Sequence, residues 1–325
     1  MIHTLHRLGE SIQFEDAIAS LLLTVNIFAP IEWFLDHIFG LGMDVLADLL
    51  GTPMLGYPYM QRAYLAAVCI ALIGPVVGTF LVHREMAMIS DTLAHTAFAG
   101  VAVGLFLNSV LSLTLSPLLT AFVVAVVTAL LVEVLVEHAG AYSDTSLAIV
   151  LTGGFAVGSI LITATDGGIA VGIDAYLFGS LATVSTENVG ILVLMSVLVG
   201  SLVTLAYRPL LYVTFDATAA RAARLNVRLY KRLMIVLTAL VVVSAMQIMG
   251  VILVAAMLVV PVAAAAQLAR GFREALLASV VLAQIAVLVG ITLSFRYNTT
   301  AGGTIVLVAV AVYIAAVLAG KVQSR

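Results

Sequence analysis

Two side chains that could contact a metal ion, Asp91 and His95, stand four residues apart beside a strongly apolar run. Residues at i and i+4 of an α-helix lie on one face, one turn apart, so the carboxylate and the imidazole would point to one place. A carboxylate oxygen with a neutral imidazole nitrogen suits Zn²⁺, Mn²⁺ or Fe²⁺ better than Ca²⁺. Two ligands are too few for a tight structural site, but a transported ion must also be released. The alternative is that Asp91 caps a helix and His95 bonds a carbonyl group.

A second group of charges lies in the connection 208–232, and its basic members are Arg208, Arg221, Arg224, Arg228, Lys231 and Arg232. Asp216 stands at an expected helix start and is followed by alanines, which are strong helix formers. Three of the arginines recur three to four residues apart, so they would share one face of a short surface helix. Such a helix would bind either lipid headgroups or a cytoplasmic partner, and these residues favour both equally.

The composition indicates the solvent in which these groups must work. The chain has 325 residues, of which 63% are hydrophobic and 10% are charged. An ordinary globular domain is about 45–50% apolar and about 25% charged. A water-soluble protein of this composition would expose apolar surface over most of its outside. We therefore expect an all-α, multi-pass protein of the cell membrane.

Several classes of site are excluded by residue content. A net charge of −3 with 14 basic residues argues against a nucleic-acid interface. Cys69 is the only cysteine, which excludes an internal disulfide or a CxxC site. Neither a phosphate-binding GxxxxGK[ST] loop nor an HExxH metal motif occurs. We expect a non-catalytic chain without a bound cofactor.

A membrane-spanning helix needs about 20 mostly apolar residues. Such runs occur at 63–82, 94–112, 117–136, 146–165, 189–207, 275–295 and 303–320. The stretch 233–268 is too long for one ordinary span, and it is either two helices hinged near Gly250 or one long tilted helix. The shorter run 169–183 is interpreted as a partial or re-entrant helix. We expect eight to ten transmembrane helices in one domain, 55–325.

Lysine and arginine in short connections predict which helix ends face the cytoplasm. The connection 208–232 is the most basic one and should be cytoplasmic. The loop with Arg270 and Arg273 and the C-terminal end with Lys321 should lie on the same side. This arrangement requires 233–268 to be two helices.

Residues 1–54 differ from the rest of the chain. Arg7 is their only Lys or Arg, and their acidic residues are Glu10, Glu15, Asp16, Glu32, Asp36, Asp44 and Asp48. We interpret them as an acidic N-terminal extension of one or two amphipathic helices at the membrane interface. An extra transmembrane helix is the alternative.

Five stretches resemble one protein family in order and spacing. They are 84–95, 144–149, 177–181, 215–225 and 246–261, with 301–306 behind the last. The family is that of the permease subunits of ATP-binding-cassette (ABC) importers for zinc, manganese or iron(II), and the likeness covers 55–320. The resemblance implies a type II-like permease architecture and a homodimer in the lipid membrane. It also implies a cytoplasmic ATP-binding subunit and an extracytoplasmic metal-binding protein as partners.

The resemblance also assigns roles to residues. Asp91 and His95 match the family's Asp-x-x-x-His pair on the ion path, although Ser90 replaces the usual glycine and Ala94 the usual serine. The segment 216–228 looks like the coupling helix that inserts into the ATPase. Its assigned residues are Asp216, Ala219, Arg221, Ala222, Arg224 and Leu225. The transported ion, Zn²⁺ or Mn²⁺, is a substrate, and which metal is preferred stays open.

Two other transporter functions compete with this one. A permease for a chelated metal or a vitamin, of the siderophore or corrinoid type, also uses many spans and a coupling helix. A secondary transporter driven by an ion gradient needs no ATPase. An intramembrane enzyme lacks support because no HExxH motif or paired carboxylates lie within the spans.

Overall fold

The computed structural model describes residues 29–111, 116–138, 143–164, 176–179 and 184–323. Within these ranges every regular element is a helix, which confirms the all-α fold class. The chain divides into two compact units, Met1–Gly56 and Tyr57–Arg325. The expected partial helix at 169–183 falls mostly outside the described residues.

In its described part, residues 29–56, the first unit holds four short helical elements. They are α2 (Ala29–Phe34), the π-helical turn η1 (Leu35–Phe39), α3 (Gly40–Leu50) and the 3₁₀ turn η2 (Pro53–Gly56). Trp33 stacks on His37 with ring centroids 5.6 Å apart. The chain leaves α3 through Gly51 in a left-handed conformation with φ of +62°, a common way for a helix to end.

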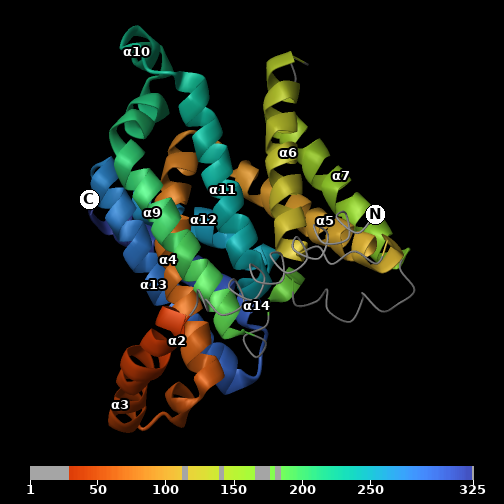
Figure 1. The fold of residues 1–325 in the computed structure, drawn as a ribbon. Coiled ribbons are helices and arrows are strands. Elements are labelled where there is room, and N and C mark those ends of the chain that lie inside the picture. The colour runs from red at the N-terminus through yellow and green to blue at the C-terminus, as the bar shows by residue number, and fades with distance from the viewer. Residues whose placement is uncertain (1–28, 112–115, 139–142, 165–175, 180–183, 324–325) are drawn as a thin grey trace, which may run out of the picture. The chain divides into compact units, whose positions relative to one another are not determined.

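The second unit contains the long apolar helices (Figure 1). They are α4 (Pro58–His83), α5 (Met88–Leu111), α6 (Pro117–His138), α7 (Ser143–Thr163), α9 (Thr186–Phe215), α11 (Val227–Met249), α12 (Val251–Ala266), α13 (Phe272–Tyr297) and α14 (Ala301–Gln323). Seven of them are long and apolar enough to cross a membrane, while the apolar parts of α6 and α12 are shorter. The described residues thus form nine apolar helices, seven of which are candidate membrane spans, against the expected eight to ten.

The inner and outer helices of this unit differ in burial. Most residues in the apolar windows of α4 and α11 are buried, whereas only a minority are buried in those of α7, α9, α13 and α14. Figure 1 shows α11 and α12 between a group made of α4, α9 and α13 and a second group made of α5, α6 and α7. Outer helices that expose apolar side chains are what a lipid solvent requires.

The stretch 233–268 is two helices, as the orientation argument required. Gly250 separates α11 from α12 and has φ of +80°, a value that side chains other than glycine rarely adopt. A Cβ atom at this position would also lie 2.5 Å from the backbone nitrogen of Gly179 and 2.6 Å from the carbonyl oxygen of Leu177. Both the conformation and the close approach of a distant segment therefore place the break at this residue.

Helix α9 continues well beyond the apolar run expected at 189–207. It runs through Arg208 and Pro209 to Phe215, so the first eight residues of the expected connection 208–232 belong to α9. The rings of Phe215 and Phe272 lie 5.6 Å apart. The end of α9 and the start of α13 therefore lie at the same end of the helix bundle. This agrees with the expectation that the connection 208–232 and the loop with Arg270 and Arg273 share one side of the membrane.

Candidate functional site

Asp91 and His95 lie in the first turns of α5 and face each other. His95 Nε2 is 3.5 Å from Asp91 Oδ1, which confirms that the i, i+4 spacing brings the two groups to one face. The Asp91 side chain is 48% exposed and that of His95 is 23% exposed. The pair is therefore reachable from outside the chain, although it sits on a helix that is largely buried.

The alternative of a capping aspartate and a carbonyl-bonded histidine does not match the structure. Helix α5 begins at Met88, so Asp91 lies inside the helix rather than at its cap. His95 Nδ1 is buried and has no hydrogen-bond partner among the described residues. Asp91 is therefore not a helix cap, and the polar contact that the structure gives for His95 is the one with Asp91.

The distance between the two donor atoms is suited to one shared ion. Two ligand atoms about 2.1 Å from a tetrahedral ion lie about 3.4 Å apart. The separation of 3.5 Å matches this value without any change of helix geometry. In the described part of the chain, no three His, Cys, Asp or Glu side chains gather to hold a metal. Among the described residues, Asp91 and His95 are therefore a candidate pair of ligands and do not form a complete metal site.

Phe155 of α7 orients the imidazole, and nothing in the spacing of Asp91 and His95 predicted it. Its ring meets the His95 ring edge-on, with centroids 5.4 Å apart and planes at 84°. Metal-binding histidines usually bond their second nitrogen to a carbonyl or carboxylate, which fixes the ring. His95 Nδ1 lacks such a bond in the described chain, so the His95 ring is held by the contact of Nε2 with Asp91 and by the ring of Phe155.

Glycines on α7 allow this contact. A Cβ atom at Gly154 would lie 2.6 Å from Thr96 Cγ2, and one at Gly158 would lie 3.1 Å from Ala99 Cα. Helix α7 can thus approach α5 closely, as expected for small residues at a helix interface. The sequence signal that could have predicted the contact with Phe155 is this pair of glycines, because Gly154 directly precedes it and marks the face of α7 that packs on α5.

The segment after α9 forms the short helix α10 (Ala217–Ala222), which has capping hydrogen bonds at both ends. Asp216 Oδ1 accepts hydrogen bonds from the backbone nitrogens of Thr218 and Ala219, both at 2.8 Å. At the other end, the nitrogen of Leu225 donates to the carbonyl of Ala220, and Arg224 has φ of +61°. These bonds are those of a Schellman ending. The expected cap by Asp216 is confirmed.

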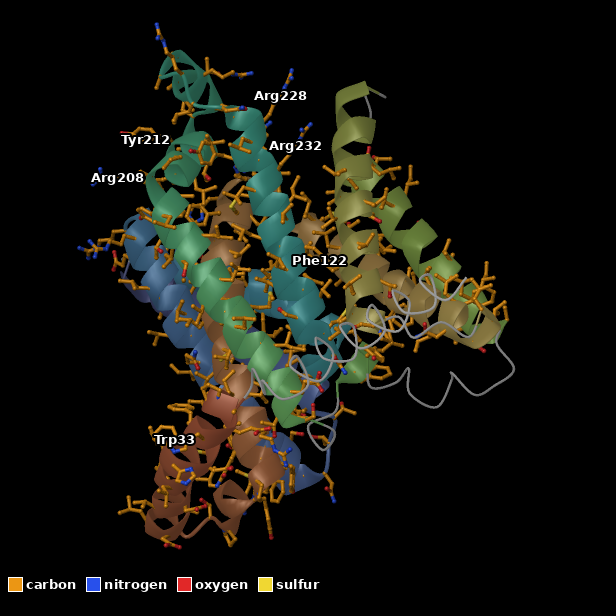
Figure 2. All side chains as sticks on the ribbon, viewed as in Figure 1. Trp33, Phe122, Arg208, Tyr212, Arg228 and Arg232 are labelled. Carbon is orange, nitrogen blue, oxygen red and sulfur yellow. The ribbon has the colours of Figure 1, made fainter. Side chains whose placement is uncertain are left out.

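The expected single basic face on 216–228 is wrong. Helix α10 ends at Ala222, Arg224 lies in the turn behind it, and Arg228 belongs to α11. The left-handed residue ends the first helix, and Asn226 starts the next by accepting from the nitrogen of Leu229 at 3.2 Å. Figure 2 shows Arg228 and Arg232 on α11 and Arg208 on α9, at the end of the bundle that carries α10.

Most residues assigned to coupling lie on the outside of α10. Asp216, Ala219, Arg221, Ala222 and Arg224 are exposed, whereas Leu225 is half-buried. Leu225 packs against a small apolar cluster of Val213, Ala220 and Val227. This cluster fixes α10 to the ends of α9 and α11, and Ala220 is the buried anchor that the sequence did not single out.

Arg84 connects the two candidate regions. Its Nη2 donates to the carbonyl oxygen of Val213 at 3.2 Å, which joins the turn before α5 to the end of α9. Burial lowers the pKa of the Arg84 guanidinium from its ordinary value. His83 lies beside it, and its ring contacts those of Phe215 and Phe272. The stretch 84–95 therefore begins next to α10 and ends at the Asp91–His95 pair.

Comparison with known proteins identifies the family. The model of the ABC 3 transport family matches residues 56–320. The manganese transport system membrane protein MntC of Halalkalibacterium halodurans is 32% identical over 79% of this chain and 85% of the relative. The manganese import system permease protein ScaB of Streptococcus gordonii is 27% identical over 79% of this chain and 90% of the relative.

A solved structure agrees with this relationship. The structure of PsaBC from Streptococcus pneumoniae in complex with Fab superposes with a TM-score of 0.74. It is 26% identical and covers 83% of this chain and 95% of its own. Since the family model spans most of the chain and the helices are those of a multi-pass membrane protein, this chain belongs to the ABC 3 transport family and is a metal ABC importer permease of the cell membrane.

Proposed function

We propose that this chain is the membrane subunit of an ATP-driven importer of Mn²⁺ or Zn²⁺, with Fe²⁺ as a further candidate substrate. It works as a homodimer and receives the ion from an extracytoplasmic metal-binding protein. A separate cytoplasmic subunit hydrolyses ATP. The observation that carries the proposal is the Asp91–His95 pair, whose donor atoms lie 3.5 Å apart on one face of α5. Relatives named for manganese transport support the choice of metal.

Asp91 and His95 would replace part of the ion's water shell during passage. An anionic oxygen and a neutral imidazole nitrogen bind a divalent transition ion without holding it as a complete protein site would. The remaining ligands are water, or the same pair from the second copy of the chain. A weak, incomplete site is what release on the other side of the membrane requires.

The coupling to ATP hydrolysis would pass through α10. Its exposed residues Asp216, Ala219, Arg221, Ala222 and Arg224 would contact the ATP-binding subunit, while Leu225 holds the helix to the bundle. ATP-driven closure of the two ATPase subunits would move α10 together with α9, to which it is packed. The bond between Arg84 and Val213 would carry that movement to α5 and would switch access to the ion path.

Transport by the reconstituted complex tests the metal assignment. Proteoliposomes with the permease dimer, its ATPase and its binding protein should take up radioactive Mn²⁺ or Zn²⁺ when ATP is present. Asp91→Ala and His95→Ala should abolish uptake while the complex still assembles, and Glu187→Ala, an exposed carboxylate at the start of α9, should leave it unchanged. Normal uptake by the double variant would refute the pair as ion ligands. A chelated substrate that competes with the free ion would favour the siderophore or corrinoid type.

Co-purification tests the coupling helix. Arg221→Glu places a negative charge on the exposed side of α10 and should reduce the amount of ATPase that stays bound. The matched control is Arg296→Glu in the last turn of α13, an exposed arginine at the opposite end of the bundle. Equal recovery of ATPase with both variants would contradict the assignment.

We further propose that the helical residues 29–50 lie at the membrane–water interface. Their exposed apolar side chains recur every three or four residues, at Phe34, Ile38, Leu41, Val45 and Leu49. Trp33 is 56% exposed, and tryptophan favours the interfacial region of a bilayer. A chain that lacks residues 1–56 should then keep the fold of the second unit.

A further inference from the structure

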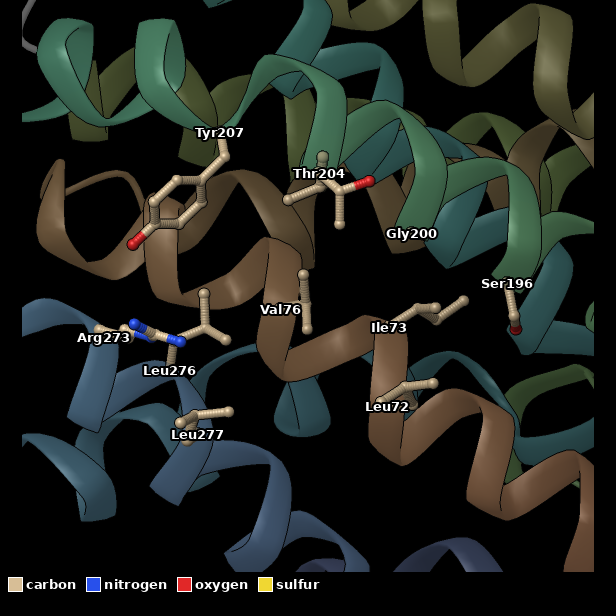
Figure 3. A pocket seen from close by; sticks show the side chains of 11 residues that line it. Leu72, Ile73, Val76, Ser196, Gly200, Thr204, Tyr207, Arg273, Leu276 and Leu277 are labelled. Carbon is tan, nitrogen blue, oxygen red and sulfur yellow. The ribbon is translucent and has the colours of Figure 1, made fainter.

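Helices α4, α9 and α13 enclose a groove of about 530 Å³ that is separate from both candidate sites. Its floor is made by α4 and its walls by α9 and α13 (Figure 3). Most lining side chains are aliphatic, among them Leu72 and Leu277, which are exposed at its open side. The groove thus opens toward the surface that faces lipid.

One end of the groove is polar and positively charged. Figure 3 shows Tyr207 of α9 and Arg273 of α13 together at that end, and Ser196 of α9 at the other. Arg273 is exposed and makes no ion pair or hydrogen bond with any residue that the structure describes. It lies in the first turn of α13, where unpaired backbone N–H groups add a partial positive charge. The neighbouring Glu274 is engaged, because its carboxylate accepts from the backbone nitrogen of Arg270 at 2.9 Å.

The length of the groove matches one leaflet of a bilayer. The eleven helical steps from Ser196 to Tyr207 measure about 16 Å along α9. Half of a hydrocarbon core is about 15 Å thick. An acyl chain that starts at the charged end would therefore run to about the middle of the membrane.

The charged end lies on the side expected to be cytoplasmic. Arg273 follows Phe272, whose ring packs against that of Phe215 at the end of α9. This level carries α10 and the basic residues of 208–232. The inner leaflet is the one whose anionic headgroups attract such clusters. This step rests on the cytoplasmic placement of α10 in the proposed function.

We propose that this groove binds one anionic phospholipid of the inner leaflet. One acyl chain lies along α4 between α9 and α13, and the phosphate accepts hydrogen bonds from Arg273 and from the Tyr207 hydroxyl. Because lipid tails are as apolar as the groove, the tail contributes packing and the headgroup contributes selectivity. Since α10 follows directly on α9, the bound lipid stabilises the part of the bundle on which α10 rests.

Native mass spectrometry of the full chain in detergent, titrated with phosphatidylglycerol or phosphatidylcholine, tests the proposal. We expect one phosphatidylglycerol to bind at least fivefold more tightly than phosphatidylcholine, the factor that about 1 kcal/mol per basic residue provides. Arg273→Gln should abolish this preference. The control Arg296→Gln makes the same change at the other end of the same helix and should keep it.

A second variant tests the tail. A Cβ atom at Gly200, which lines the groove, would meet nothing within 4 Å, so Gly200→Leu fills the groove without a backbone clash. It should reduce binding of both lipids, whereas Gly153→Leu, equally unobstructed but on α7, should not. Equal binding of the two lipids to the unmodified chain, or unchanged preference in Arg273→Gln, would overturn the proposal. Unchanged binding in Gly200→Leu would overturn the placement of the tail.

Discussion

The cap of α10 by Asp216 can be tested by removing it. Two backbone nitrogens, those of Thr218 and Ala219, donate to Asp216 Oδ1 at 2.8 Å. Loss of an N-cap costs about 1–2 kcal/mol. Helix α10 has only six residues, so it has too few internal hydrogen bonds to remain stable once the cap is lost. Asp216→Ala should therefore raise the open population of α10 about five- to thirtyfold.

Amide hydrogen exchange measures this opening directly. The informative amides are those of Ala220, Ala223 and Leu225, whose nitrogens donate to backbone carbonyls of the same segment. Their exchange should accelerate by the same five- to thirtyfold in Asp216→Ala, because exchange follows local opening. Asp216→Ser keeps a capping oxygen and should leave exchange close to that of the unmodified chain.

The matched control removes the cap of the next helix. Asn226→Ala takes away the acceptor for the nitrogen of Leu229 and should loosen the start of α11 while α10 stays protected. If exchange at Ala220 and Leu225 is unchanged in Asp216→Ala, the cap does not stabilise α10. If Asp216→Ser accelerates it as much, the carboxylate acts by its charge rather than as a cap.

Two further predictions concern the junctions of the bundle. Gly250→Ala should lower the melting temperature of the detergent-solubilised chain by several degrees, because it adds strain at φ of +80° and a clash with the backbone at 177–179. The control Gly153→Ala should not lower it, because a Cβ atom there meets nothing within 4 Å. Equal melting temperatures of the two variants would refute the role of Gly250. Arg84→Gln removes a charged donor from the Val213 carbonyl, which costs about 1.5–3 kcal/mol, and should reduce transport per ATP hydrolysed without changing metal binding at the proposed Asp91–His95 site. Unchanged coupling would contradict the proposed path from α10 to α5.

Local patterns predicted much of this protein correctly. The apolar runs placed most transmembrane helices, since a lipid solvent demands about 20 apolar residues per span. The four-residue spacing placed Asp91 and His95 on one face, because helix geometry alone determines it. The cap at Asp216 was equally local, since the acceptor and its donors are two and three residues apart.

Other features depended on residues far apart in the chain. The basic pattern in 216–228 predicted one helix, but Arg224 adopts a left-handed conformation that ends α10, and Leu225 after it packs onto Val213 and Val227. Phe155 reaches His95 only because α7 packs closely on α5.

The sequence by itself determined the solvent, the helices and the pairing of residues one turn apart, because hydropathy and hydrogen bonds between near neighbours act within single segments. Only the tertiary structure decided that Arg84 joins the turn before α5 to the end of α9, and that α4, α9 and α13 enclose a groove. These features arise where backbones distant in the chain come into contact. Such contacts depend on the packing of whole helices, which no local pattern encodes.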